Sequence, residues 1–142
     1  MKPSKKNGNS LALETRRLLR HLDTPDLLRH NVLVAHLFDE YSPDAALAAI
    51  RNMVHRALDR LVEQARYAKR ERAVRYRTIV MKYDLGGEPA CAVAADLGLS
   101  MRHFYRERHA ACVEIGTLLK QIIPERPRAN YVSSVFEVAE SA

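Results

Sequence analysis

The stretch from residue 97 to 111, LGLSMRHFYRERHAA, concentrates side chains that could bind a polyanion. Arg102 and Arg106 are four residues apart, so on a helix they share one face. Arginine can donate two hydrogen bonds to O6 and N7 of guanine, and a helix in the major groove presents its N-terminal residues to base edges. These residue types indicate a helix that binds double-stranded DNA and contacts its bases. The simpler interpretation is an amphipathic helix with a basic face and no ligand.

A turn residue and a cap before this helix determine which of its sides faces outward. Gly98 tolerates the positive φ of a tight turn, and Ser100 can cap the helix that follows. Phe104 should then point inward and pack against Val93 of a short preceding helix. Ala94 supplies the small side chain where the two helices cross. The sequence therefore predicts two helices joined by a short turn, as in a helix-turn-helix.

The polar and flexible side chains of the second helix form the predicted DNA-binding set. Its members are Ser100, Met101, Arg102, His103, Tyr105, Arg106, Arg108 and His109. Within this set, Met101 suits the methyl group of thymine. Tyr105, Arg108 and His109 suit phosphate oxygens, and such contacts fix the register on DNA without reading its sequence.

The chain as a whole is basic, with 23 Lys and Arg against 17 Asp and Glu and a formal net charge of +6. Surplus positive charge favours polyanionic partners, nucleic acid first. No apolar signal segment follows the polar start, and no run approaches the ~18 apolar residues of a membrane span. We therefore expect a cytoplasmic, nucleoid-associated protein that does not bind membranes. Its two cysteines are expected to be reduced, small and buried.

A composition rich in Ala, Leu, Arg and Glu predicts an all-α protein, with an N-terminal helical segment followed by a helix-turn-helix domain. Residues 1–9 are expected to be disordered, and residues 10–70 to form a helical N-terminal region for oligomerisation. The helix-turn-helix domain is placed at residues 71–123. The tail over residues 124–142 could dock on the domain, pair as a strand or lead into a further region.

Three helices are predicted before residue 70. The first runs from a cap at Ser10 to about His21. The second starts at Pro25 and includes NVLVAHLF, which is apolar almost all round and therefore typical of a core or an interface. The third opens at Pro43, after the cap Ser42, and reaches about residue 68.

The third of these helices carries an apolar seam at heptad-like spacing. The seam consists of Leu47, Ile50, Val54, Ala57 and Leu61, with Leu58 beside them. Such a seam fits a coiled-coil contact with a second subunit, and it fits packing inside one chain equally well. We expect a homodimer formed through the first three helices, with intramolecular packing as the alternative.

The remaining helices are predicted over residues 72–84, 89–96 and 101–121. The first of them should end at Gly86 or Gly87, because glycine adopts the left-handed conformation that commonly follows a helix.

The stretch YRTIVMKYDLGGEPACAVAADLGLSMRHFYRERHAACVEIGTLL resembles the sigma-factor-like helix-turn-helix of bacterial transcription regulators. The shared elements are Y-x-L-G-G, V-A-x-x-L-G-L-S and F-Y-R-E-R-x-A, over about 45 residues. The upstream LRHLDTPDLLRHNVLVAHL is similar to helical segments that precede such domains. The resemblance implies a regulator whose recognition helix maps to Ser100 through His109. Two features depart from the family's pattern: Glu88 and Pro89 replace its usual Ser or Thr opening, and Cys91 and Ala92 stand where an acid usually precedes the Val-Ala pair. These departures affect capping and surface charge, not groove contact.

Catalytic and metal-binding interpretations have less support. The histidines before residue 60 are scattered, and none forms an HExxH pair. Asp39, Glu40 and Asp44 lie at a junction between helices, where acids are usually solvated. The spacing of the remaining His and Cys residues matches no common set of zinc ligands. The residues concerned are Cys91, His103, His109 and Cys112. We expect no enzymatic activity, no cofactor and no metal.

The stronger alternative is a sigma-like interaction module that binds RNA polymerase or another regulator without direct, specific DNA contact. The same basic face can meet an acidic protein surface. Salt separates the two hypotheses, because phosphate binding weakens steeply as salt rises.

Overall fold

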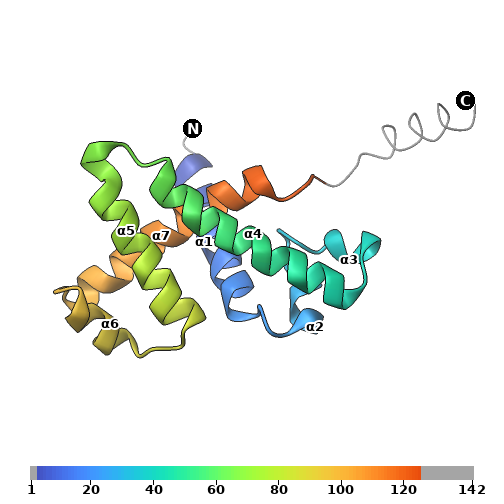
Figure 1. Ribbon diagram of the computed structural model, residues 1–142, viewed down its shortest axis with the longest axis horizontal. Helices are drawn as coiled ribbons and strands as arrows, with labels where there is room; N and C mark the ends of the chain where they lie inside the picture. The colour runs from blue at the N-terminus through green and yellow to red at the C-terminus, as the bar shows by residue number, and fades with distance from the viewer. Residues whose placement is uncertain (1–2, 126–142) are drawn as a thin grey trace, which may run out of the picture.

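The computed structural model describes residues 3–125, which form helices and turns and contain no strand. In chain order the helices are α1 (Pro3–Arg20), α2 (Pro25–Leu28), α3 (Leu37–Glu40), α4 (Pro43–Glu63), the 3₁₀ helix η1 (Tyr67–Lys69), α5 (Arg70–Ile79), the π-helical η2 (Val80–Leu85), α6 (Ala90–Asp96) and α7 (Met101–Ile122). The predicted all-α fold is confirmed. In Figure 1, α6 lies at one end of the molecule, and α2 and α3 lie at the other.

The first helix begins earlier than the sequence indicates. The prediction of disorder over residues 1–9 is wrong for residues 3–9, because α1 starts at Pro3. Proline fits the first turn of a helix, where its missing N–H would have no intrahelical partner. Ser10 consequently lies within α1 and does not cap it.

The segment NVLVAHLF does not form the continuous buried helix that we expected, since turns separate α2 from α3. Asn31 accounts for the interruption. Its Oδ1 accepts a hydrogen bond from the Leu33 N–H (3.0 Å), and its Nδ2 donates to the Glu14 carbonyl on α1 (3.0 Å). Side-chain bonds of this kind compete with helical ones. As a result, Val34 is fully buried whereas Val32 is 75% exposed.

The helix α4 has the predicted start and an earlier end. Ser42 caps it, with its Oγ accepting from the Ala45 N–H at 3.2 Å. The helix ends at Glu63 and does not reach residue 68, because Arg66 adopts an extended conformation (φ −69°, ψ 156°). This turn redirects the chain, so that α5 packs against both α4 and α7.

The apolar seam of α4 is occupied inside the chain. The buried residues of the seam share one core with residues of α1, α5 and α7. These seam residues are Ile50, Val54, Ala57, Leu58 and Leu61, and the half-buried Leu47 packs against the same core. The alternative of packing inside one chain is therefore confirmed for this seam, and the homodimer stays a prediction.

One main core spans the boundary that we placed at residue 70. Leu18 of α1, Leu58 of α4, Tyr76 of α5 and Leu119 of α7 all belong to it. Side chains from both sides of residue 70 therefore pack into the same core.

A close helix crossing in this core occurs where α1 meets α7 at Gly116. A Cβ at position 116 would collide with Oγ1 of Thr15 and lie 2.8 Å from Cγ of Leu11. The absence of a side chain at Gly116 therefore allows α1 to approach the middle of α7.

The second half of the described chain follows the predicted order of helices. The segment predicted as one helix over 72–84 is α5 continued by η2, and Gly87 follows with φ of 68°. The tail over residues 126–142 lies outside the described residues. None of the helices within residues 3–125 has the length and apolar character required to cross a bilayer.

Candidate nucleic-acid interface

The turn between α6 and α7 has the geometry that the sequence predicts. Gly98 adopts a φ of 67°, in the left-handed region. The N–H of Leu99 donates to the Ala94 carbonyl at 2.8 Å, which closes the end of α6. Ser100 caps α7, with its Oγ accepting from the His103 N–H at 3.1 Å. These local bonds fix the direction in which α7 leaves the turn.

A small apolar cluster, separate from the main core, holds α6 against the start of α7. Its buried members are Ile79, Val93, Ala94 and Phe104, and Tyr83 and Leu97 are half-buried against them. Phe104 is fully buried and meets the Tyr83 ring edge-on, with centroids 5.3 Å apart. The predicted inward position of Phe104 against Val93 is confirmed.

Burial of Phe104 leaves the opposite side of α7 exposed to solvent. The exposed members of the predicted set are Ser100, Met101, Arg102, His103, Tyr105, Arg106 and His109. Met101 and Tyr105 are 41% and 47% exposed, which is high for large apolar side chains. Among residues 3–125, no carboxylate forms an ion pair with Arg102 or Arg106. Both guanidinium groups are therefore available to an external acceptor.

Arg108 does not belong to this exposed face, and its assignment to phosphate contact is wrong. Its side chain is 8% exposed and forms an ion pair with Asp84 of η2, whose side chain is 5% exposed. The Arg108 Nη2 donates to Asp84 Oδ1 at 2.5 Å, and the guanidinium stacks 5.2 Å from the Tyr83 ring centroid. Arg108 follows Phe104 by one helical turn, so the period that placed Phe104 inward also applies to Arg108.

A second ion-pair cluster ties α7 to α5. Glu107 is largely buried, and its Oε1 accepts a hydrogen bond from Arg75 Nε at 2.9 Å. In the same ion pair, Arg75 Nη2 lies 2.5 Å from that oxygen. His103 Nε2 lies 3.5 Å from the same carboxylate. Burial, followed by the charge of Glu107, raises the pKa of the adjacent Tyr76. Sequence reasoning missed this cluster, because Arg75 and Glu107 are far apart in the chain.

The cysteines and histidines of α6 and α7 form no metal site. Within the part of the chain that the structure describes, no three His, Cys, Asp or Glu residues are grouped so that they could hold an ion. Cys112 is buried as predicted, whereas Cys91 is exposed on α6, contrary to the prediction. Burial raises the pKa of the Cys112 thiol to about 12.

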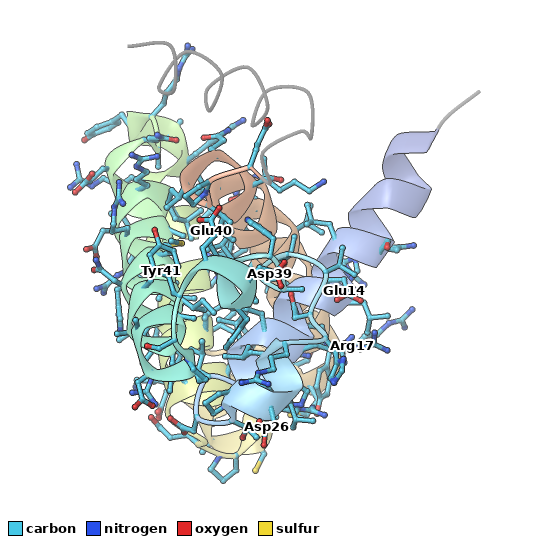
Figure 2. The ribbon with its side chains drawn as sticks, turned by 90° about the vertical axis from the view of Figure 1, so that its right-hand side faces the viewer. Glu14, Arg17, Asp26, Asp39, Glu40 and Tyr41 are labelled. Carbon is cyan, nitrogen blue, oxygen red and sulfur yellow. The ribbon has the colours of Figure 1, made fainter. Side chains whose placement is uncertain are left out.

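Acidic residues lie at the other end of the molecule. Asp39 and Glu40 are exposed on α3, and Asp44 is exposed at the start of α4. Figure 2 shows Asp39 and Glu40 on the face formed by α2, α3 and part of α1. The exposed cations of α7 are therefore separated from this group of carboxylates.

Comparison with known proteins provides no independent guide to this face. No protein-family model, no curated protein and no solved structure matches the chain. The assignment of a function therefore depends on the geometry and charge described above.

Proposed function

We propose that the protein binds double-stranded DNA sequence-specifically and acts as a transcription regulator. In this proposal α6 and α7 form a helix-turn-helix, and the N-terminal half of α7 enters the major groove. The sigma-like resemblance of residues 76–119 points in the same direction.

The observation that carries the proposal is the exposed pair Arg102 and Arg106 on a rigidly held helix. The buried Phe104 and the ion pairs of Glu107 and Arg108 fix the rotation of α7 about its axis. Arg102 and Arg106 then project from the solvent side with no carboxylate partner among the described residues. Arginine in this arrangement can donate two hydrogen bonds to guanine.

The neighbouring exposed residues suit the remaining contacts of a DNA-binding helix. Met101 precedes Arg102 at the tip of α7, where an apolar side chain can meet a thymine methyl. Tyr105 and His109 are exposed further along and suit phosphate oxygens. The capped N-terminus of α7 adds free backbone N–H groups, which also favour a phosphate.

The first test is selection of bound duplexes from a random pool, followed by anisotropy titrations on the selected site. Arg102→Ala and Arg106→Ala should each weaken binding by about 1–3 kcal/mol if each reads a base. Arg56→Ala is the matched control, because Arg56 is exposed on α4 and its loss changes the net charge equally. That control should reduce affinity much less than either variant in α7. Wild-type affinity in both α7 variants would show that this face does not bind DNA.

A salt titration with random duplex separates this proposal from a protein-interaction module for RNA polymerase or another regulator. Release of counterions from DNA predicts a log–log slope of about −0.9 for each phosphate neutralised. Weak binding with no dependence on salt would instead favour the interaction module.

A further inference from the structure

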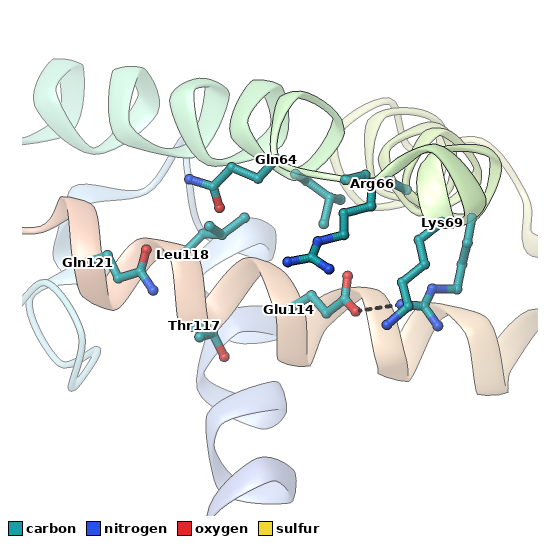
Figure 3. A pocket seen from close by; sticks show the side chains of 11 residues that line it. Gln64, Arg66, Lys69, Glu114, Thr117, Leu118 and Gln121 are labelled. Atoms are coloured by element: carbon teal, nitrogen blue, oxygen red, sulfur yellow. Dashed lines mark hydrogen bonds and ion pairs between the residues drawn. The ribbon is translucent and has the colours of Figure 1, made fainter.

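The corner between α4 and α5 forms an open groove against the C-terminal half of α7. Its volume is about 430 Å³, which is within the range of sites for small molecules. Figure 3 shows Gln64 and Arg66 on one side of the groove and Glu114, Thr117, Leu118 and Gln121 of α7 on the other. The groove is remote from the DNA-binding face proposed above, since Glu114 lies about 18 Å along α7 from Arg102.

Three cations line this groove against one carboxylate. Arg66, Lys69 and Arg72 come from the α4–α5 corner, and Glu114 comes from α7. Arg72 forms an ion pair with Glu114, with Nη2 and Oε1 3.5 Å apart. Within residues 3–125, neither Arg66 nor Lys69 has a carboxylate partner. With Arg72 paired to Glu114, the groove keeps a net positive charge from Arg66 and Lys69, and such a surface attracts anions.

The remaining lining is apolar at the base of the groove and able to form hydrogen bonds at its rim. Leu61, Ala65, Ala73 and Leu118 supply the apolar part, while Gln64, Thr117 and Gln121 supply amide and hydroxyl groups. Small-molecule sites commonly combine an apolar lining with a few polar groups that fix orientation. An inorganic anion would leave the apolar part uncovered, and a purely apolar molecule would leave Arg66 and Lys69 without a partner.

We propose that this groove binds a small organic anion. Its phosphate, sulfonate or carboxylate group contacts Arg66 and Lys69, and its ring or chain covers Leu61, Ala65 and Leu118. Guanidinium groups suit this role because their planar donors match the oxygens of such anions. The proposal does not depend on DNA binding, since the residues of the two surfaces do not overlap.

The test uses two fluorescent probes with the same rings and different charge. The probe 8-anilinonaphthalene-1-sulfonate carries a sulfonate, and N-phenyl-1-naphthylamine lacks it. We expect the sulfonate probe to bind the folded full chain saturably at one site, and the neutral probe to bind at least tenfold more weakly. Inorganic phosphate should displace the sulfonate probe only at high concentration, because it contacts the cations alone.

Variants locate the bound probe. Arg66→Gln combined with Lys69→Gln should raise the dissociation constant of the sulfonate probe at least tenfold. Thr117→Phe should do the same by filling the groove without a change of charge. The control combines Arg56→Gln with Arg70→Gln, two exposed cations outside the groove, and should leave probe affinity within twofold of the wild type.

Three results of the probe experiments would overturn the proposal. These are equal binding of the two probes, binding of the sulfonate probe at several equivalent sites, and equal losses in the groove and control variants. A loss of DNA affinity in the double groove variant with unchanged probe binding would also overturn it, because the groove would then contact the phosphate backbone of DNA.

Discussion

Cys91 and Cys112 differ in environment although both lie on helices of the same half of the chain. Cys112 is buried in the main core, and Cys91 is exposed on α6. A thiol reacts through its thiolate, and burial of Cys112 raises its pKa to about 12. In the native protein at pH 8, Ellman's reagent should therefore modify one thiol, and both should react in guanidinium chloride. A Cys91→Ala variant should show no reaction in the native state, and rapid modification of Cys112 there would contradict its burial.

The same shift predicts how stability depends on pH. Burial raises the pKa of Cys112 from the ordinary thiol value of 9.0 to about 12, so above pH 9 the unfolded chain binds fewer protons than the folded chain. The free energy of unfolding must then fall as pH rises from about 9 to about 12. The raised pKa of Tyr76 acts in the same direction. Urea midpoints measured from pH 7 to 11 should therefore fall less steeply in Cys112→Ala than in the wild type, and equal slopes would contradict the shift.

At the scale of elements, specific contacts with α1, α5 and η2 help to fix the position of α7. Gly116 lets α1 approach its middle, Glu107 pairs with Arg75 of α5, and Arg108 pairs with Asp84 of η2. The last two contacts lie next to the exposed face, and they restrict both the tilt and the rotation of α7. The position of the proposed DNA-binding residues therefore depends on ion pairs made on the inward side of α7.

Asp84→Ala should destabilise the protein by about 3–5 kcal/mol, because it leaves the Arg108 guanidinium buried without a counterion. Chemical denaturation measures the change. Asp59→Ala is the control, since Asp59 is 59% exposed in its pair with Arg77, and exposed pairs contribute about 0–1 kcal/mol. Combining Asp84→Ala with Arg108→Met should recover much of the loss, as no buried charge then remains. Equal effects of Asp84→Ala and Asp59→Ala would show that the Arg108 pair is solvated.

At the scale of the whole molecule, helices from both halves of the chain build one main core. A fragment of residues 70–125 would expose Ile115 and Leu119 of α7, which in the full chain share the core with α1 and α4. It would also be shorter than most domains that fold alone. We expect this fragment to lack a cooperative unfolding transition by circular dichroism, in contrast to the full chain. A cooperative transition in the fragment would support residue 70 as a domain boundary.

The sequence by itself determined the features that depend on neighbours within one or two helical turns. Gly98 and Ser100 specified the turn and the cap, and the spacing to Phe104 specified which side of α7 is inward. Each of these features depends on backbone sterics, a local hydrogen bond or the helical period. All three can be predicted from one short stretch of sequence. The all-α fold and the capped start of α4 were predicted for the same reason.

The tertiary structure decided everything that depends on a partner distant in the chain. The helical spacing from Phe104 already indicates that Arg108 faces inward, but only the tertiary structure shows that Asp84, 24 residues earlier, is its buried partner. The seam of α4 fitted two partners equally, and only the arrangement of α1, α5 and α7 showed that it is covered from within. Asn31 interrupts a helix through a bond to α1. In each case the outcome depends on desolvation or packing between two elements. The local spacing of residues does not indicate which distant element will make that contact.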